Sequence, residues 1–241
     1  EKVTGKKGNK LNYTINKTMM RIDLEEPLKP KANVSFNIKW WYNVNDGGNY
    51  GGRSGYEHFP KEDNYMYHIA QFYPRMCAYN ETDGWQNKQF LGRGEFTLSF
   101  GNFKVAITAP ADHTVGATGV LQNGKEVLTA TQLERLEASK KSDKPLMITN
   151  QEEAEKIEKG KSKEKKTWVF KAENVRDFGF CSPRKFIWDA QGYKQGGKVQ
   201  PFVMAMSFYP KEGGELWSKY STEAIVHTME VYSRFSFDYP Y

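Results

Sequence analysis

The chain has 241 residues, of which 38% are hydrophobic and 15% aromatic, so one large domain or two small ones can bury a core. No stretch approaches the roughly 18 uncharged apolar residues that cross a bilayer, which excludes a membrane-spanning helix at this stage. The first ten residues, EKVTGKKGNK, lack the apolar core of a signal peptide.

The net charge of +6 is concentrated in two short stretches. Residues 1–10 contain four Lys and one Glu, and residues 159–166 contain five Lys and one Glu. We expect the first to be a basic tail and the second a solvated loop. A nucleic-acid surface would intersperse basic and aromatic side chains on one folded element, so we expect no nucleic-acid partner.

The first hundred residues predict strands separated by loops. In residues 13–24 the apolar positions change parity near Met19 and Met20, which indicates a β-bulge. Residues 33–44, NVSFNIKWWYNV, alternate strictly and predict the clearest strand, with one buried and one open face. Five glycines within 45–55 indicate a loop, and residues 65–73 return to a strand-like composition.

Two glycine positions predict sharp changes of direction. Residues 95–100 and 103–110 both alternate, so Gly101 and Asn102 indicate either a two-residue hairpin turn or a bulge in one long strand. Residues 122–124, Gln-Asn-Gly, lie between the apolar segments 114–121 and 125–128 and indicate another hairpin.

Short helices are expected in the following segment and one long helix at the end. Thr131 and Glu134 have the spacing of a capping box, and Asn150 is placed to cap a second short helix after a strand at 146–149. Strands resume in 167–171, 176–180, 184–190 and 202–210. From about Glu215 to Arg234 the apolar period becomes helical, and one face would carry Trp217, Tyr220, Ala224, Val231 and Phe235.

Motifs for catalysis are missing from the sequence. The four histidines lie at positions 58, 68, 113 and 227; none is followed by Glu, and no two are three or four residues apart. We therefore predict no catalytic residue and no metal site here, the alternative being a site assembled from distant histidines. Residues 119–126 and 192–199 have a Gly-x4-Gly-Lys frame without the Ser or Thr of a phosphate-binding loop. Cys77 and Cys181 are expected to be free buried thiols, the alternative being a single bridge between them that the spacing does not reveal.

One stretch carries a far more specific signal. Residues 68–118, HIAQFYPRMCAYNETDGWQNKQFLGRGEFTLSFGNFKVAITAPADHTVGAT, resemble the bacterial branch of the aminopeptidase N family of zinc metallopeptidases. Residues 167–190 and 203–241 resemble the same branch, so the likeness covers most of 18–241. The sequence Gln-Phe-Tyr at 71–73 and the strand ending in Pro110 carry the family's pattern.

The resemblance implies a domain layout. Residues 11–210 would form the family's N-terminal β domain without its first strands, which leaves an open sheet edge, and residues 211–241 would form the helix that begins the catalytic domain. The implied fold is mainly β, with twisted antiparallel sheets in a saddle-like or sandwich arrangement, short helices in an insertion and one C-terminal helix. The zinc, the Gly-x-Met-Glu-Asn motif and the His-Glu-x-x-His helix would belong to a catalytic domain beyond Tyr241.

The resemblance also suggests site residues. Gln71 and Tyr73 would line the substrate cleft of the parent enzyme, although they could equally be ordinary strand residues. In many members the residue two after the Gln is a Glu that binds the substrate's α-amine. Here it is Tyr73, whose hydroxyl accepts a hydrogen bond but supplies no negative charge at neutral pH.

Two functions follow as hypotheses. The first is a non-catalytic domain that positions peptide substrates, with its own catalytic domain as partner; the family branch and four Asn-x-Ser/Thr sequons lead us to expect an extracytoplasmic location. The second is a self-standing β-sandwich module that binds glycans or proteins through exposed aromatics such as Trp41 and Trp85. The terminal helix distinguishes them, because an independent module has no use for an amphipathic helix without a partner.

Overall fold

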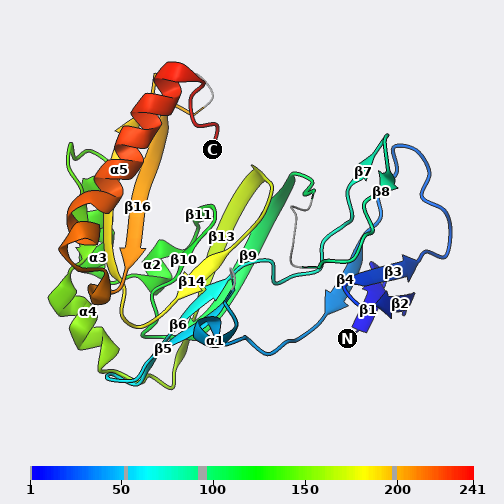
Figure 1. Ribbon diagram of the computed structural model, residues 1–241, viewed down its shortest axis with the longest axis horizontal. Coiled ribbons are helices and arrows are strands. Elements are labelled where there is room, and N and C mark those ends of the chain that lie inside the picture. Colours follow the sequence, from blue (N-terminus) through cyan, green and yellow to red (C-terminus); the bar gives the residue numbers. More distant parts are fainter. Residues whose placement is uncertain (1, 52–53, 92–96, 197–199) are drawn as a thin grey trace. The chain divides into compact units, whose positions relative to one another are not determined.

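The computed structural model describes residues 2–51, 54–91, 97–196 and 200–241 (Figure 1). The fold is mainly β, the strands of every sheet pair antiparallel, and a long helix stands near the C-terminus, which confirms the predicted fold class. The chain divides into two compact units. Unit 1 contains Glu1–Val44 and Phe72–Phe100, and unit 2 contains Asn45–Gln71 and Gly101–Tyr241.

Unit 1 consists of three two-stranded sheets. They pair β1 (Lys2–Gly5) with β4 (Phe36–Lys39), β2 (Asn12–Asn16) with β3 (Met19–Asp23), and β7 (Tyr79–Asn80) with β8 (Gly84–Trp85). The expectation of a basic tail at 1–10 is therefore wrong for residues 2–5. Val3 lies opposite Ile38 and is only 1% exposed, so burial of this side chain holds the segment in a sheet.

The parity change in 13–24 marks a hairpin and not a bulge. Asn16 pairs with Met19, which leaves Lys17 and Thr18 as a two-residue turn, and Lys17 has a positive φ of 54°. The Thr18 N–H and hydroxyl both donate to Gln89 Oε1, at 2.9 and 2.7 Å, so a contact distant in sequence stabilises this turn.

The strand expected at 33–44 is much shorter, because pairing stops at Lys39. Trp40 leaves the sheet and its indole N–H donates to the Phe72 carbonyl at 3.0 Å. Trp41 is 79% exposed. Alternation alone predicted a buried face that the described part of this segment does not form.

Unit 2 contains three sheets and most of the buried side chains. The first has the order β10 (Gly116–Ala117), β14 (Phe180–Ser182), β6 (Asn64–Ile69), β5 (Gly55–Phe59). The second is β11 (Val120–Leu121), β13 (Lys165–Val175), β9 (Gly101–Pro110), and the third is β12 (Leu146–Thr149), β15 (Ile187–Lys194), β16 (Phe202–Tyr209). Buried aromatic residues of the core are Trp168, Phe170, Phe178, Phe186, Trp188 and Tyr209.

The helices of unit 2 are α1 (Gly47–Tyr50), α2 (Gly124–Val127), α3 (Ala130–Ser139), α4 (Gln151–Glu158) and α5 (Gly214–Phe235), the last preceded by the short 3-10 helix η1 (Lys211–Gly213). The long C-terminal helix is thus confirmed, and Figure 1 draws it along β16. Asn150 caps α4, as predicted, and it does so in a capping box with Glu153 that was not predicted from the sequence. The other box is shifted by two residues, since Thr129 has the extended backbone of a cap and pairs with Gln132.

The hairpin predicted at 122–124 is not formed, and of the two alternatives at Gly101 and Asn102, a hairpin turn or a bulge, the described residues show no hairpin. Residues 122–124 lead into α2, because the Asn123 side chain accepts the Val169 N–H and donates to the Thr167 carbonyl of β13. Gly101 begins β9, and the described residues 97–100 before it are not in a strand, whereas 95 and 96 lie outside the described residues. The bulge is in the partner strand β13, where Asn174 has a positive φ of 53° and donates its N–H to Asn102 Oδ1.

Candidate functional site

Gln71 and Tyr73 fall at the point where the chain passes from unit 2 to unit 1. Strand β6 ends at Ile69, so neither residue belongs to the strand expected at 65–73. Gln71 is exposed and has a positive φ of 53°, a conformation uncommon for a residue other than glycine. The Tyr73 ring is half-buried against Phe72, with 5.1 Å between ring centroids, and the Arg75 guanidinium lies 5.6 Å from its centroid. Their place in a substrate cleft stays a prediction.

The described histidines are scattered over different elements. Within residues 2–51, 54–91, 97–196 and 200–241, no three His, Cys, Asp or Glu side chains gather as a metal site. His58 contacts Asp63 at 3.3 Å, and the exposed His227 lies 3.7 Å from Glu230 on the same helix. Both are surface contacts between an imidazole and a carboxylate, a kind of contact that contributes little to stability.

One cysteine–histidine pair was invisible in the sequence. Cys181 and His68 are 113 positions apart, but they are directly opposed on β14 and β6, with 3.3 Å between Sγ and Nδ1. The other ring nitrogen of His68 is 3.9 Å from Glu57. Burial raises the pKa of the Cys181 thiol, so the nucleophilic thiolate is disfavoured, and the pair does not support covalent catalysis. Both cysteines, Cys77 and Cys181, are free.

A serine–histidine pair lies deeper in unit 2. His113 Nδ1 is 2.9 Å from the Ser182 hydroxyl, and His113 is only 5% exposed. Burial and the positive charge of Arg184 together lower the pKa of His113 to about 4, while Asp112 opposes the shift. We interpret this neutral, buried imidazole as a structural group.

The C-terminal helix buries a different side from the one its apolar residues mark. Thr222 is 2% exposed, and Val226, Met229 and Ser233 are half-buried, so these positions face the sheet. The Thr222 hydroxyl donates to Ser207 Oγ on β16 at 2.7 Å. This polar contact joins the buried side of α5 to β16, on the same side as the half-buried Val226 and Met229.

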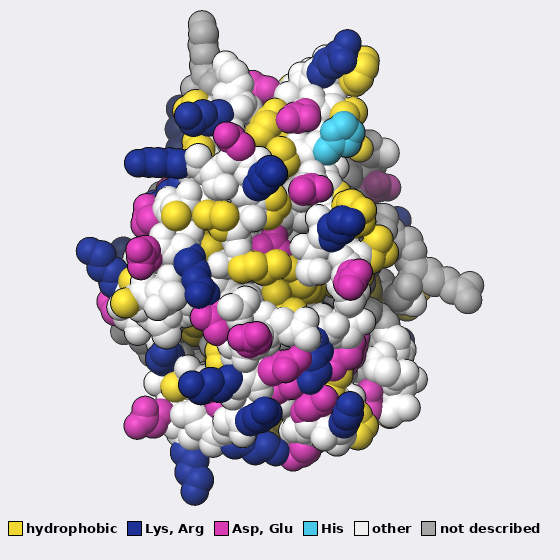
Figure 2. Space-filling model, turned by 90° about the vertical axis from the view of Figure 1, so that its left-hand side faces the viewer, with side chains coloured by type: hydrophobic (Ala, Val, Ile, Leu, Met, Phe, Trp, Pro, Cys, Tyr) yellow, Lys and Arg dark blue, Asp and Glu magenta, His cyan; other side chains and the backbone are white. Residues whose placement is uncertain are grey.

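Most of the apolar side predicted for α5 is exposed, although the Trp217 ring lies 6.2 Å from the Tyr209 ring at the end of β16. The exposed large apolar side chains of the helix are Leu216, Trp217, Tyr220, Ile225, Val231, Tyr232 and Phe235. Trp217 is 47% exposed and Phe235 is 77% exposed. Figure 2 shows hydrophobic side chains in a band between charged ones on the side of the molecule that carries α3, α4 and α5. Contiguous exposed apolar surface of this kind marks an interaction site.

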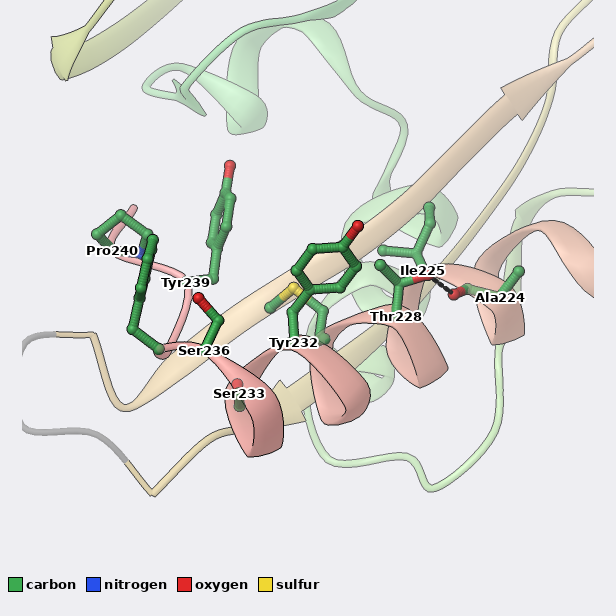
Figure 3. Close-up of a pocket in the computed structure, with 10 residues that line it drawn as sticks. Ala224, Ile225, Thr228, Tyr232, Ser233, Ser236, Tyr239 and Pro240 are labelled. Atoms are coloured by element: carbon green, nitrogen blue, oxygen red, sulfur yellow. Dashed lines mark hydrogen bonds between the residues drawn. The ribbon is translucent and has the colours of Figure 1, made fainter.

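A groove of about 480 Å³ continues this surface. It lies between α5 and the segment after it, and Figure 3 shows Tyr232 on the helix and Tyr239 on the returning segment at either side of it. Among the described residues, those that line the groove are all uncharged: Ala224, Ile225, Thr228, Met229, Tyr232, Ser233, Ser236, Phe237, Tyr239 and Pro240. Such a lining binds apolar side chains and supplies no acid or base.

Residues 236–240, the segment that follows α5, are held in place by one buried side chain. Gln195 is 5% exposed, donates from Nε2 to the Tyr239 carbonyl at 2.7 Å, and accepts the Tyr239 N–H on Oε1 at 3.1 Å. A side-chain amide thus replaces the backbone partner that a neighbouring strand would offer. Residues 236–240 are thereby held back along the helix, where they form one wall of the groove.

The N-terminal end of α5 is fixed by buried charges. The Lys185 ammonium, on a side chain 1% exposed, lies 2.7 Å from Glu212 in η1 and 4.0 Å from Glu62 and Glu158. Lys211, also in η1, bonds Glu158 and Glu62 at 2.5 and 3.1 Å. The bond with Glu158 raises the pKa of Lys211, so the cation is retained at neutral pH. The network joins η1 to α4 and to the loop that contains Glu62.

In the parts of the chain that the structure describes, no helix is both long and apolar enough to cross a bilayer. Comparisons with family models, curated proteins and solved structures found nothing that matches this chain.

Proposed function

We propose that this chain contains the non-catalytic N-terminal β domain of a zinc aminopeptidase of the aminopeptidase N family, and that α5 is the first helix of the catalytic domain, whose remaining part packs on the apolar side of α5. The observation that carries the proposal is this exposed side of a 22-residue helix, together with the uncharged groove beside it. Its residues lie in 203–241, one of the three segments that resemble the family.

The role of the domain would be positioning. It would bound one side of the cleft and orient the substrate's N-terminus, with Gln71 and Tyr73 as the residues nearest the peptide. The zinc would be held by the catalytic domain, where it activates a water molecule for peptide hydrolysis. Because Tyr73 has no negative charge at neutral pH, another group would have to bind the α-amine.

The first test is to read the gene past Tyr241. The proposal expects a Gly-x-Met-Glu-Asn motif followed by His-Glu-x-x-His in the same frame. A frame that stops, or that continues without a zinc-ligand cluster, rules the peptidase assignment out.

The second test uses the longer polypeptide, loaded with zinc and assayed on aminoacyl substrates. Val231→Glu places a charge in the centre of the apolar side of α5, and we expect at least a tenfold loss of activity. Glu223→Lys, an exposed residue of the same helix, is the matched control and should leave activity unchanged. Equal activity of the two variants would show that this side of α5 does not contact the catalytic domain.

The alternative is a self-standing module that binds glycans or proteins. It is favoured by two exposed indoles of unit 1, Trp41 at 79% and Trp85 at 57% exposure. Aromatic faces of this kind stack on sugar rings or anchor protein partners. A glycan array probed with the chain and with a Trp41→Ala, Trp85→Ala variant tests it: binding that disappears in the variant supports the module.

A further inference from the structure

Helix α5 is attached to its sheet by very little buried surface. It has 22 residues, and among the described residues of this helix Thr222 is the one that is buried. Val226 and Met229 are half-buried on the same side of the helix. Because most of the stability of a helix in a protein comes from its packed side, a helix that buries so little has a small docking free energy. One change in the polar contacts beneath α5 can therefore alter its position.

The two ends of α5 have attachments of their own. The start of the helix is joined through η1 to buried charges, where Lys211 bonds Glu158 and Lys185 lies 2.7 Å from Glu212. The segment after the helix is held by the hydrogen bonds between Gln195 and Tyr239. The middle of the helix can consequently move while both ends stay in place.

A carboxyl group lies beneath this middle part. Asp189 is 1% exposed and stands directly opposite Ser207 in the β15–β16 pair, so both side chains point to the same side of the sheet. The Thr222 hydroxyl reaches Ser207 from the helix. Asp189 Oδ2 accepts the Tyr209 hydroxyl at 2.6 Å, whereas Oδ1 is buried and has no hydrogen-bond partner within the described residues. The carboxyl group is thus enclosed between the sheet and the helix.

The groups around this carboxyl carry no positive charge. Directly opposite Asp189 on β12 is Met147, and the α4 residue packed beside Tyr209 is Ala154, while the end of α3 meets the other side of β15. In the described chain, the one titratable side chain bonded to Asp189 is Tyr209. Burial raises the pKa of Tyr209, so its hydroxyl stays protonated and remains a donor. A carboxylate buried without a cation is costly, and this site therefore favours the protonated carboxyl group.

The direction of the pH effect follows from this environment. Burial raises the pKa of Asp189, although the hydroxyls of Thr222 and Tyr209 oppose the shift. When the helix moves away, the carboxyl group becomes hydrated and its pKa returns toward the ordinary value of 3.8. The docking of α5 is therefore strongest below pH 3.8 and weakens as pH rises to the raised pKa, above which it stays weak.

Movement of α5 would also change the groove beside it. Met229 and Ser233 face the sheet and line the groove, so they move with the helix. Tyr239 lies on the opposite wall and is held separately by Gln195. Displacement of the middle of α5 therefore separates the two walls and uncovers Met229, an adaptable apolar side chain suited to binding.

We propose that Asp189 makes the docking of α5 pH-dependent: with the carboxyl group protonated the helix lies tightly on β15 and β16, and with the carboxylate formed the middle of the helix moves off the sheet and opens the groove. The switch lies within unit 2 and needs no catalytic domain, so it goes beyond the proposed function. Failure of either proposal leaves the other standing.

Hydrogen exchange of the intact chain between pH 3.5 and 8 tests the switch. The exchange rate of each amide is expressed as a protection factor, which removes the intrinsic effect of pH. We expect protection of residues 222–233 to fall at least tenfold as pH rises, relative to β9 and β13 in the same unit. A tenfold change requires that the pKa of Asp189 differ by at least one unit between the two positions of α5. An equal fall in α5, β9 and β13 would overturn the proposal, because the whole unit would then be opening.

Three variants make the test specific for this carboxyl group. Asp189→Asn keeps the shape and removes the charge, so α5 should show the same relative protection at every pH. Tyr209→Phe removes a donor that favours the carboxylate, so the pH at which protection is lost should rise. Glu223→Gln removes a carboxylate from the exposed side of the same helix and should leave the pH dependence unchanged. A pH dependence that survives Asp189→Asn, or a midpoint that does not rise in Tyr209→Phe, would overturn the proposal.

Discussion

Replacing Lys185 by Met tests whether buried charges hold the start of α5. Met keeps the aliphatic length of the side chain and removes its ammonium, which lies 2.7 Å from Glu212 and 3.5 Å from the centroid of the Phe59 ring. Glu158, which is 4% exposed, would then have Lys211 as its remaining cation in this network.

The expected loss of unfolding free energy follows from how deeply the removed charge is buried. Taking one partner out of a buried ion pair destabilises a protein by about 3–5 kcal/mol, because the other charge stays desolvated. The Glu212 side chain is 40% exposed and can recover some hydration, so we expect the lower end, about 3 kcal/mol. For a unit of this size that lowers Tm by about 6–12 °C.

Chemical denaturation followed by circular dichroism measures the loss, and hydrogen exchange locates it. Amides of η1 and of the first turns of α5 should lose protection before those of β13 and β9. Lys171→Met is the matched control: Lys171 pairs with Glu173 on the surface, where both side chains are more than half exposed, and its loss should be barely measurable.

If Lys185→Met is as stable as the parent chain, or more stable, the ammonium of Lys185 contributes no more to stability than an apolar side chain does, and the prediction is wrong. Adding Glu212→Gln to the Lys185→Met chain should recover about 1 kcal/mol, since it removes one uncompensated carboxylate. If Glu212→Gln recovers no stability, the destabilisation by Lys185→Met comes from altered packing and not from an unpaired charge.

Three further predictions concern the polar groups beneath α5 and in the core. The pKa of His113 is about 4 in the folded chain and 6.5 ordinarily, so between these pH values the unfolded chain binds a proton that the folded chain does not. The free energy of unfolding should therefore fall by up to about 3 kcal/mol as pH drops from 6.5 to 4. His113→Asn should remove this pH dependence, measured by urea unfolding at each pH. Burial raises the pKa of Asp189, although hydrogen bonds from Thr222 and Tyr209 oppose the shift. The contribution of Asp189 to the free energy of unfolding is therefore favourable at low pH, where the carboxyl is protonated, and is lost as pH rises through the raised pKa. Asp189→Asn should therefore stabilise the chain at pH 7 by about 1 kcal/mol, with a smaller gain in acid; a loss at pH 7 would contradict this. Thr222→Val should cost about 1–2 kcal/mol and loosen α5, whereas the exposed Thr228→Val should cost less than half of that, and equal costs would contradict the buried hydroxyl bond to β16.

The sequence predicted those elements that are specified by residues close together in the chain. The helical period after Gly214 located α5 to within about one residue, and Asn150 marked the start of α4, because a cap and a period depend on residues a few positions apart. The β-rich class followed in the same way from period-two alternation and glycine-marked loops.

The tertiary structure decided everything that depends on distant partners. The turn at Lys17 and Thr18 was mistaken for a bulge because parity alone cannot distinguish a reversal from an extra residue, and Gln89 is what stabilises it. The pairing of His68 with Cys181 comes from the register of β6 against β14, which no spacing reveals. Helix α5 shows the limit most clearly: periodicity identified an apolar side, but the side that packs on β16 is the one with the buried Thr222, whose hydroxyl donates to Ser207. Which side of a helix is buried depends on the neighbouring sheet, and the period of the helix alone does not contain that information.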